Sequence, residues 1–367
     1  MQFVCKRQRL SEILSVLGDV IPARSAKAVL QNIYVQPIPE QAKIVLCATD
    51  LEIDLRYQFE VEGLAKGDTE SILLPAQRLI SLIRDDRSDE ITFTISGQIA
   101  KIKTEFGMFH LTGSASDDFP AQPETKKENQ VQIPGNDLEE ALQKTLISVA
   151  RGDARYTLNG ILINIDENIA EFVSTDTHRL SRVIKKIKNP EKVKSEGIVI
   201  SRGIATLSKL AANREFITLQ LTDKSLIAET PDATLSVRLV EGQFPRYREV
   251  IPTKLEKRFT VDRENFLWQV RLVGNFANDE THAIALEFKD EDHLIIRGKG
   301  PASASADQTI DADIRGGEFL IKFNYVYLLD YFKGINDEKA TLQLNNATAA
   351  ARADSGDFTY VIMPVQD

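Results

Sequence analysis

Ser174, Asp176 and His178 are the residues of this chain whose types and spacing most directly suggest chemistry. They alternate at i, i+2 and i+4, which on a β-strand would place a hydroxyl, a carboxylate and an imidazole on one face. A serine hydrolase uses these three groups, but it presents its nucleophile at an exposed turn and usually takes the partners from separate segments. No Gly-x-Ser-x-Gly run surrounds Ser174. A hydrolase therefore stays an alternative hypothesis, and we expect no catalytic residue.

The remaining reactive side chains do not indicate a cofactor. The histidines are His110, His178, His282 and His293. Their spacing does not match a zinc site, and Gly298-Lys299-Gly300 lacks the glycine spacing of a phosphate-binding loop. Cys5 and Cys47 are the two cysteines, without CxxC spacing, so they are expected to be reduced core side chains. We expect no metal, no other cofactor and no disulfide.

Composition indicates a globular protein with a restricted nucleic-acid surface. The 367 residues are 43% hydrophobic and 27% charged, and this length predicts two or three domains. The formal net charge of −9 argues against DNA binding over the whole surface, because such binding is mostly phosphate neutralisation by lysine and arginine. Any DNA contact must be confined to one face. Neither a signal peptide nor 18 consecutive apolar residues occur, so we expect a cytoplasmic protein without membrane contact.

A threefold internal repeat organises the chain. Phe3, Val131 and Phe259 each lie in a short strand-like run before an amphipathic helix, and they are spaced by 128 residues. The pair Thr49-Asp50 recurs 126 residues later as Thr175-Asp176. We therefore expect three domains, at residues 1–125, 126–253 and 254–367.

Each repeat is expected to contain two βαβββ units, which gives an α+β fold with helices on one side of the sheets. Helix faces follow from apolar residues at i, i+3, i+4 and i+7, as at Leu10, Ile13, Leu14 and Leu17. A second helix in each repeat is predicted at Pro75–Arg84, Ser201–Ala212 and Asn324–Phe332. Asn136 with Glu139, and separately Asp262, are predicted helix caps.

Several runs together resemble one family. They are the three repeats, Thr175-Asp176-Thr177-His178-Arg179-Leu180, Phe244-Pro245-Arg246-Tyr247 and Val361-Ile362-Met363-Pro364. With these, the whole chain is similar to the bacterial DNA polymerase III beta subunits, the sliding clamps. The resemblance implies a head-to-tail homodimeric ring around duplex DNA, with helices lining a central channel and sheets outside. It implies a non-enzymatic tether for the polymerase III catalytic subunit, the clamp loader and other proteins that carry a clamp-binding peptide.

The resemblance also implies a peptide pocket. Its residues would be Leu158, Thr175, Thr177, His178, Arg179, Leu180, Pro245, Val250, Val361, Met363, Pro364 and Val365. Apolar side chains would form the cavity and tolerate varied peptides, while Arg179 and His178 would orient polar groups of the peptide. Two residues depart from the family: Thr177 stands where glycine is frequent, and Glu249 stands where a basic residue is found. We expect Thr177 to narrow the pocket and Glu249 to disfavour acidic peptides.

DNA and dimer contacts are implied in the same way. The DNA channel would use Arg24, Arg78, Lys144, Arg151, Arg155, Tyr156 and Arg202. The dimer seam would pair an edge strand of the first domain with one of the third, beside Phe109, Leu111 and Phe276. Asn275 and Ser303–Ala306 replace apolar and acidic family residues, so we expect a seam of low charge complementarity. A repeat scaffold that binds peptides without DNA is the other alternative.

Overall fold

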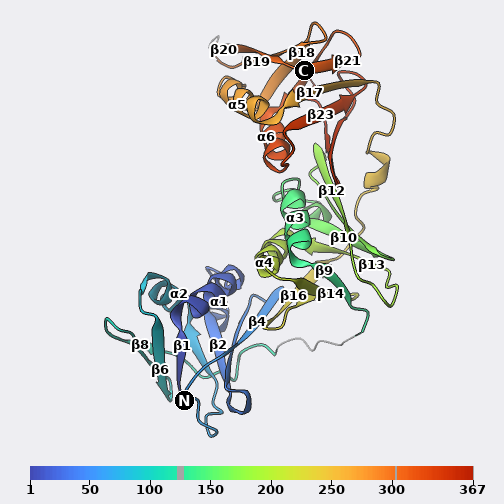
Figure 1. Ribbon diagram of the computed structural model, residues 1–367. Coiled ribbons are helices and arrows are strands. Elements are labelled where there is room, and N and C mark those ends of the chain that lie inside the picture. The colour runs from blue at the N-terminus through green and yellow to red at the C-terminus, as the bar shows by residue number, and fades with distance from the viewer. Residues whose placement is uncertain (122–127, 302–303, 367) are drawn as a thin grey trace. The chain divides into compact units, whose positions relative to one another are not determined.

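Six βαβββ modules follow one another along the chain in the computed structural model, which describes residues 1–121, 128–301 and 304–366 (Figure 1). The first repeat contains β1 (Gln2–Lys6), α1 (Arg7–Val20), β2 (Asn32–Ile38), β3 (Lys43–Thr49), β4 (Ile53–Glu60), β5 (Ile72–Pro75), α2 (Ala76–Asp85), β6 (Glu90–Ser96), β7 (Ile99–Lys103) and β8 (Met108–Thr112). The second contains β9 (Val131–Pro134), α3 (Gly135–Leu146), β10 (Gly160–Asp166), β11 (Ile169–Thr175), β12 (Arg179–Lys186), β13 (Ser195–Ile200), α4 (Ser201–Ala211), β14 (Phe216–Leu221), β15 (Ser225–Glu229) and β16 (Ala233–Val240). The third contains β17 (Lys257–Asp262), α5 (Arg263–Gly274), β18 (Ala283–Phe288), β19 (His293–Lys299), β20 (Ser305–Asp311), β21 (Asp313–Arg315), β22 (Phe319–Asn324), α6 (Tyr325–Lys333), β23 (Lys339–Leu344), β24 (Ala351–Ser355) and β25 (Phe358–Ile362).

These elements confirm the predicted α+β class and the repeated βαβββ order. Short 3₁₀ turns lie between them at η1 (Ala28–Gln31), η2 (Pro39–Gln41), η3 (Tyr156–Leu158) and η4 (Tyr247–Glu249). The predicted second helices appear as α2, α4 and α6. None of the helices in the described residues is long and apolar enough to cross a membrane.

Tertiary contacts divide the chain into two compact units that do not follow the repeat boundaries. The N-terminal unit holds residues 1–139 and 187–239, and the C-terminal unit holds residues 140–186 and 240–367. The middle repeat is therefore shared, because its first half packs with the third repeat and its second half packs with the first. The domain boundary predicted after residue 125 lies outside the described residues.

The N-terminal unit contains one continuous antiparallel ladder that crosses from the first repeat into the second. Its strand order is β5-β2-β3-β4-β16-β15-β14-β9. The crossing is the β4·β16 pair, in which Ile53 lies opposite Val237 and Tyr57 opposite Ala233. A second sheet has the order β1-β6-β7-β8, and β8 is its edge strand.

The C-terminal unit repeats this plan. Its ladder has the order β10-β11-β12-β25-β24-β23-β17-β21, and the crossing from the second repeat into the third is the β12·β25 pair. A separate sheet has the order β20-β19-β18-β22, with β20 at its edge. Because crossing strands pair through backbone hydrogen bonds, side chains of two repeats are brought directly opposite each other.

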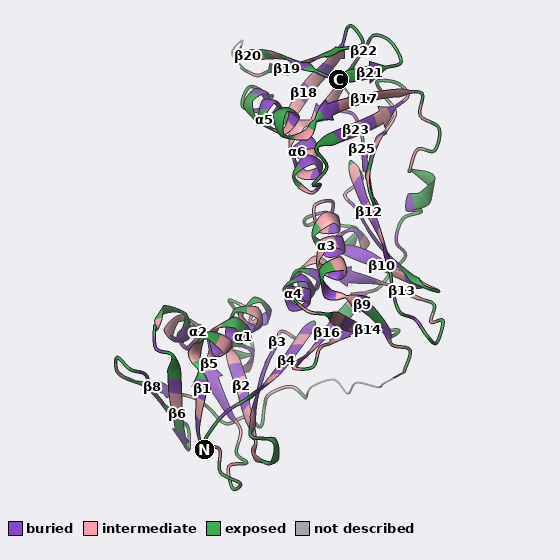
Figure 2. Ribbon diagram, viewed as in Figure 1, coloured by how far each residue is buried: buried purple, intermediate pink, exposed green. Residues whose placement is uncertain are grey.

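Helices cover the sheets through the apolar faces that the sequence predicts (Figure 2). In α1, Leu10, Ile13, Leu14 and Leu17 are all buried, and α1 packs against α2 and α4. The third repeat has an aromatic core around Phe266, whose ring centroid lies 4.5 Å from that of Phe332 and 6.3 Å from that of Phe259. Helices α1 and α5 therefore each bury one stripe and leave the opposite stripe exposed.

The two helix-cap predictions have different outcomes. Asp262 caps α5 as predicted, because its carboxylate accepts a hydrogen bond from the Asn265 amide at 2.8 Å. The capping box at Asn136 is wrong, because α3 already begins at Gly135. A Cβ at Gly135 would lie 2.3 Å from the Arg214 carbonyl oxygen, so close backbone packing sets where this helix starts.

The repeated Thr-Asp pair forms the same hairpin turn twice. Between β3 and β4, the Thr49 hydroxyl oxygen accepts from the Leu51 amide at 3.0 Å. The Asp50 carboxylate accepts from the amides of Glu52 and Ile53 at 2.9 and 2.7 Å. These bonds hold Leu51 at φ 79°, in the left-handed region.

Between β11 and β12 the bonds recur. The Thr175 hydroxyl oxygen accepts from the Thr177 amide at 3.1 Å, and Asp176 accepts from the amides of His178 and Arg179 at 3.0 Å each. Thr177 has φ 75°, a conformation that costs a β-branched residue free energy. The Thr-Asp pair therefore determines the turn conformation. The residue that follows the pair, Leu51 or Thr177, adopts the left-handed conformation that this turn requires.

We expect Thr177→Gly to stabilise the protein. The left-handed conformation costs an L-residue roughly 1–2 kcal/mol, and part of this gain is offset because glycine has more conformational entropy to lose on folding. The net increase in the free energy of unfolding should be about 0.5 kcal/mol. Calorimetry should show a midpoint raised by about 1–2 °C, and Leu51→Gly in the counterpart turn should act in the same direction. A lower midpoint in both variants would contradict this account of the turns.

Candidate functional site

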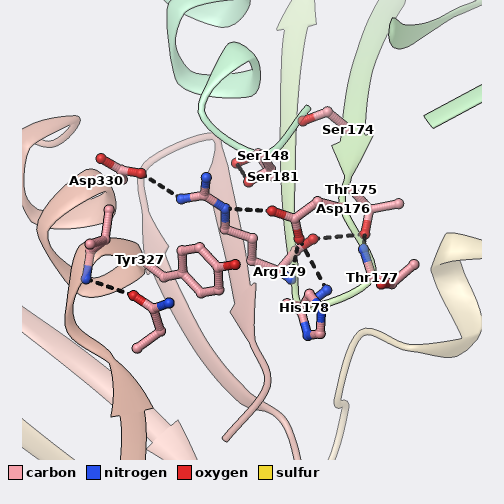
Figure 3. A network of polar contacts seen from close by, with 12 residues as sticks. Ser148, Ser174, Thr175, Asp176, Thr177, His178, Arg179, Ser181, Tyr327 and Asp330 are labelled. Atoms are coloured by element: carbon pink, nitrogen blue, oxygen red, sulfur yellow. Dashed lines mark hydrogen bonds and ion pairs between the residues drawn. The ribbon is translucent and has the colours of Figure 1, made fainter. Parts of the chain in front are cut away.

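Ser174, Asp176 and His178 do not form a catalytic group. Ser174 is the last residue but one of β11 (Figure 3). It is fully buried and donates its hydroxyl hydrogen to the Thr145 carbonyl. Asp176 and His178 lie in the following turn, so the prediction of one strand face is wrong. Asp176 uses its carboxylate for backbone amides and Arg179. A buried, committed hydroxyl cannot serve as an exposed nucleophile, which removes the hydrolase hypothesis.

Contacts within the chain hold Arg179, which is predicted to orient a peptide. Its guanidinium donates to Asp176 at 3.0 Å and to Asp330 of α6 at 2.5 Å, and it lies 4.2 Å from the ring centroid of Tyr327 (Figure 3). Only 11% of its side chain is exposed. Burial alone would lower the pKa of Arg179, but the hydrogen bond to Asp330 and the charge of Asp176 contribute to raising it overall. Arg179 therefore ties the hairpin turn to the third repeat.

An apolar cavity of about 390 Å³ lies beside this hairpin, within the C-terminal unit. Its lining residues are Arg155, Thr175, Thr177, Arg179, Leu180, Pro245, Arg246, Tyr247, Glu249, Val250, Val361 and Met363. The β12·β25 ladder sets its centre, because Leu180 lies directly opposite Val361. The ladder continues past β25, where the Met363 amide donates to the His178 carbonyl at 2.8 Å. A cavity of this size holds a short apolar segment of a ligand.

Eight of the predicted pocket residues meet at this cavity: Thr175, Thr177, Arg179, Leu180, Pro245, Val250, Val361 and Met363. Four do not line it. Leu158 is fully buried, Pro364 is buried, and the Val365 amide donates to the Lys322 carbonyl at 2.8 Å. His178 lies in the turn and contributes its backbone rather than its ring. These four residues lie near lining residues in the sequence, but they do not line the cavity themselves.

The cavity also contains residues that the sequence reasoning did not assign to it. Arg246 and Tyr247 directly follow the predicted residue Pro245, so the continuity of that run is a usable signal, whereas Glu249 is already predicted as an acidic departure at the pocket. Arg155 was assigned to DNA, and no sequence signal placed it here. At the rim, Arg246 pairs with Glu249 at 3.5 Å, and both are well exposed. Glu249, predicted as an acidic residue where the family has a basic one, therefore lies at the rim of the cavity.

The predicted DNA residues fall into two groups. Arg24, Arg78 and Arg151 are exposed and make no ion pair within the described residues, and Tyr156 is 76% exposed. The others already have acidic partners. Arg155 binds Asp153, whose pKa the arginine's hydrogen bond lowers to about 2, and Arg202 binds Asp50.

Among the residues predicted to contact DNA, Lys144 differs most clearly from the prediction. It donates to Glu140 at 2.6 Å, and only 11% of its side chain is exposed. Its ammonium also lies 5.5 Å from the ring centroid of Phe358. Lys144 therefore belongs to the packing of α3 rather than to an open basic surface.

The predicted seam residues lie on or beside the two edge strands. Phe109 on β8 is 40% exposed and Phe276 after α5 is 38% exposed, whereas Leu111 is buried in its own repeat. The Asn275 amide donates to the Arg271 and Leu272 carbonyls at the end of α5. Ser303 lies outside the described residues. Within those residues, no group of three or more histidine, cysteine or acidic side chains is arranged to hold a metal ion.

Comparison with known proteins agrees with this geometry. Family models of the N-terminal, central and C-terminal domains of the DNA polymerase III beta subunit match residues 1–123, 132–246 and 248–366. Beta sliding clamps from Vibrio cholerae and Pseudomonas aeruginosa are 26% and 27% identical over 371 residues, covering the whole of each chain. The crystal structure of the DNA polymerase III subunit beta from Pseudomonas aeruginosa covers 100% of both chains at 26% identity, with a TM-score of 0.91. This protein belongs to the DNA polymerase III beta subunit family, the non-enzymatic sliding clamps that act as processivity factors of a DNA polymerase.

Proposed function

We propose that two copies of this chain close head to tail into a ring around duplex DNA and hold the replicative polymerase to it through the apolar cavity. The three repeats, 1–125, 126–253 and 254–367, would be the domains of each copy. The observation that carries this proposal is the strand pairing between successive repeats, which occurs twice in the described residues and leaves one strand of each kind at a sheet edge there.

The strand spacing supports a third pairing of the same kind. Strands β4, β12 and β20 begin 126 residues apart, and β8, β16 and β25 begin 125 residues apart. Within the chain β4 pairs with β16 and β12 pairs with β25. The remaining members, β20 and β8, are edge strands of their sheets in the described residues. Pairing β20 of one copy with β8 of another satisfies both edges, and such a head-to-tail contact forms a ring when its rotation closes.

Exposed apolar side chains beside these edges favour the contact. On α5, Trp268 and Leu272 are 60% and 39% exposed and share one helix face by their spacing, and Phe276, two residues beyond the helix, is 38% exposed. α5 packs against β20, so this stripe flanks one edge. Phe109 and Met108 are exposed on β8, the other edge. Burying these groups would add apolar stabilisation to the backbone ladder.

DNA contact by such a ring should be weak and independent of sequence. Arg24, Arg78 and Arg151, which have no acidic partner within the described residues, are the best candidates, together with the exposed Tyr156. Nonspecific phosphate contacts give dissociation constants of roughly 10⁻⁴ to 10⁻⁶ M, which permits sliding. The closed ring, rather than affinity, would keep the protein on DNA. We propose that the protein acts in the cytoplasm, where the duplex DNA that it would encircle is located.

The cavity would receive the clamp-binding peptides of the polymerase III catalytic subunit, the clamp loader and other DNA-processing proteins. Its apolar lining suits a short extended segment, and the flexible Met363 suits varied side chains. A partner bound there to an encircling ring rebinds as an intramolecular event, so modest affinity supports long synthesis. The alternative hypothesis, a scaffold that binds peptides without DNA, would use the same cavity. It differs from the proposed function only because it forms no ring around DNA.

Retention on circular DNA tests the function directly. We expect the protein, loaded by its cognate clamp loader onto a nicked circle, to stay with the DNA in gel filtration. Cutting the circle once should release it, because the topological link is lost. Equal retention on circular and linear DNA would contradict the ring, and no retention on either would favour the scaffold.

The free arginines should carry the salt dependence of DNA binding. Each of Arg24→Ala, Arg78→Ala and Arg151→Ala is expected to reduce the slope of log K against log salt concentration by about 1. Fluorescence anisotropy with a short duplex at several salt concentrations measures this slope. Lys101→Ala is the matched control, since Lys101 is exposed on the face of β7 opposite to buried Ala100 and Ile102. An equal loss in the control would exclude a localised DNA surface.

The seam should depend on Phe109. We expect Phe109→Lys to raise the dimer dissociation constant at least about tenfold, because it places a charge in an apolar contact. Ile169→Lys changes an equally exposed residue, at 40%, outside the proposed seam and should leave dimerisation unchanged. Analytical ultracentrifugation measures both. A steep rise of wild-type dissociation with salt would contradict a seam of backbone and apolar contacts.

A further inference from the structure

Glu171 is a buried carboxylate in β11, with only 3% of its side chain exposed. Arg182 of β12 and Arg248 of η4 both donate to it, the latter at 2.6 Å. The Tyr247 hydroxyl donates to it at 2.6 Å, and the Asn164 amide at 3.4 Å. One side chain thus joins three strands of the second repeat to a segment far along the chain.

That segment forms one wall of the cavity. Pro245, Arg246, Tyr247, Glu249 and Val250 all line it. The segment lies between β16 and β17 and pairs with no strand in the described residues. Its backbone bonds are local, as from the Tyr247 amide to the Pro245 carbonyl at 2.7 Å and from the Val250 amide to the Tyr247 carbonyl at 3.2 Å. The wall therefore needs side-chain links to hold its place.

Charge balance makes the Glu171 link a strong one. Burial by itself raises the pKa of Glu171, but the Tyr247 hydroxyl and the two arginines outweigh burial and hold the pKa below its usual value. The carboxylate therefore remains ionised and fully hydrogen-bonded. Charge-assisted hydrogen bonds in a low-dielectric environment are short and directional, and a partner left unpaired there is costly.

We propose that Glu171 is a positioning residue for the peptide pocket, which fixes the wall at Pro245–Val250 through Tyr247 and Arg248. The proposal rests on the proposed peptide binding at this cavity. Glu171 does not line the cavity itself, so it acts through Tyr247, which lines the cavity and whose hydroxyl binds the carboxylate. Affinity for the peptide would then depend on a hydrogen bond that the peptide never touches.

Two variants separate positioning from general stability. Tyr247→Phe keeps the aromatic ring and removes only the hydroxyl donor. Glu171→Gln keeps an acceptor for Tyr247 but leaves two arginines without their counter-charge. Glu287→Gln is the matched control, because Glu287 of β18 also binds two cations, Arg297 and Lys289, and does not reach the cavity.

The experiment uses the full chain and a fluorescein-labelled peptide that copies the clamp-binding segment of the polymerase catalytic subunit from the same genome. Anisotropy titration should show binding weakened about tenfold by Glu171→Gln and at least about threefold by Tyr247→Phe. Hydrogen exchange should rise in residues 244–250 of both variants, while Tyr247→Phe and Glu287→Gln keep the wild-type unfolding midpoint. The two effects on affinity should be less than additive in the double variant, because both break one link.

Wild-type affinity and wild-type exchange in Tyr247→Phe would overturn the positioning role while leaving peptide binding intact. If Glu171→Gln fails to fold, Tyr247→Phe decides the question alone. Weakening by Glu287→Gln equal to that by Glu171→Gln would also overturn the proposal. Absence of peptide binding by the wild-type protein would instead reject the proposed function of the cavity, and the positioning role with it.

Discussion

Backbone groups at the edge of a sheet need partners, and this requirement shapes the whole chain. The chain meets it by pairing a strand of one repeat with a strand of the next, at β4·β16 and again at β12·β25. The second pairing also creates the cavity, because it sets Leu180 opposite Val361 and brings Met363 to the hairpin turn. The same antiparallel strand pairing, with its register, therefore determines both how the repeats are joined and where the cavity forms.

The fold was largely predictable because its signals are periodic and local. Helix faces follow from the spacing of Leu10, Ile13 and Leu14, and the module order follows from the 128-residue repeat. The start of α3 was not predictable, since it depends on how closely Gly135 approaches the backbone at Arg214. A local capping pattern at Asn136 carries no information on that approach.

The site was predictable only in part, because side-chain direction depends on distant partners. Arg179 lines the cavity, and the direction of its side chain is set by Asp330, 151 residues later in the chain. Glu171 gave no signal at all, since its importance lies in a contact with Tyr247. Lys144 is the exception, because Glu140 precedes it by one helical turn and the i, i+4 pair is visible in the sequence.

The strand pairings between repeats also have a mechanical consequence. At β4·β16 and β12·β25 the repeats are joined by the continuous covalent chain as well as by a ladder of hydrogen bonds, so two connections in parallel carry any tension. In the proposed ring the seam between β8 and β20 has the ladder and the apolar contacts beside it, but no covalent connection. The same tension acts on the seams and on the junctions inside each chain, so the seams yield first. Opening such a ring requires only that one short pair of strands and its flanking side chains separate.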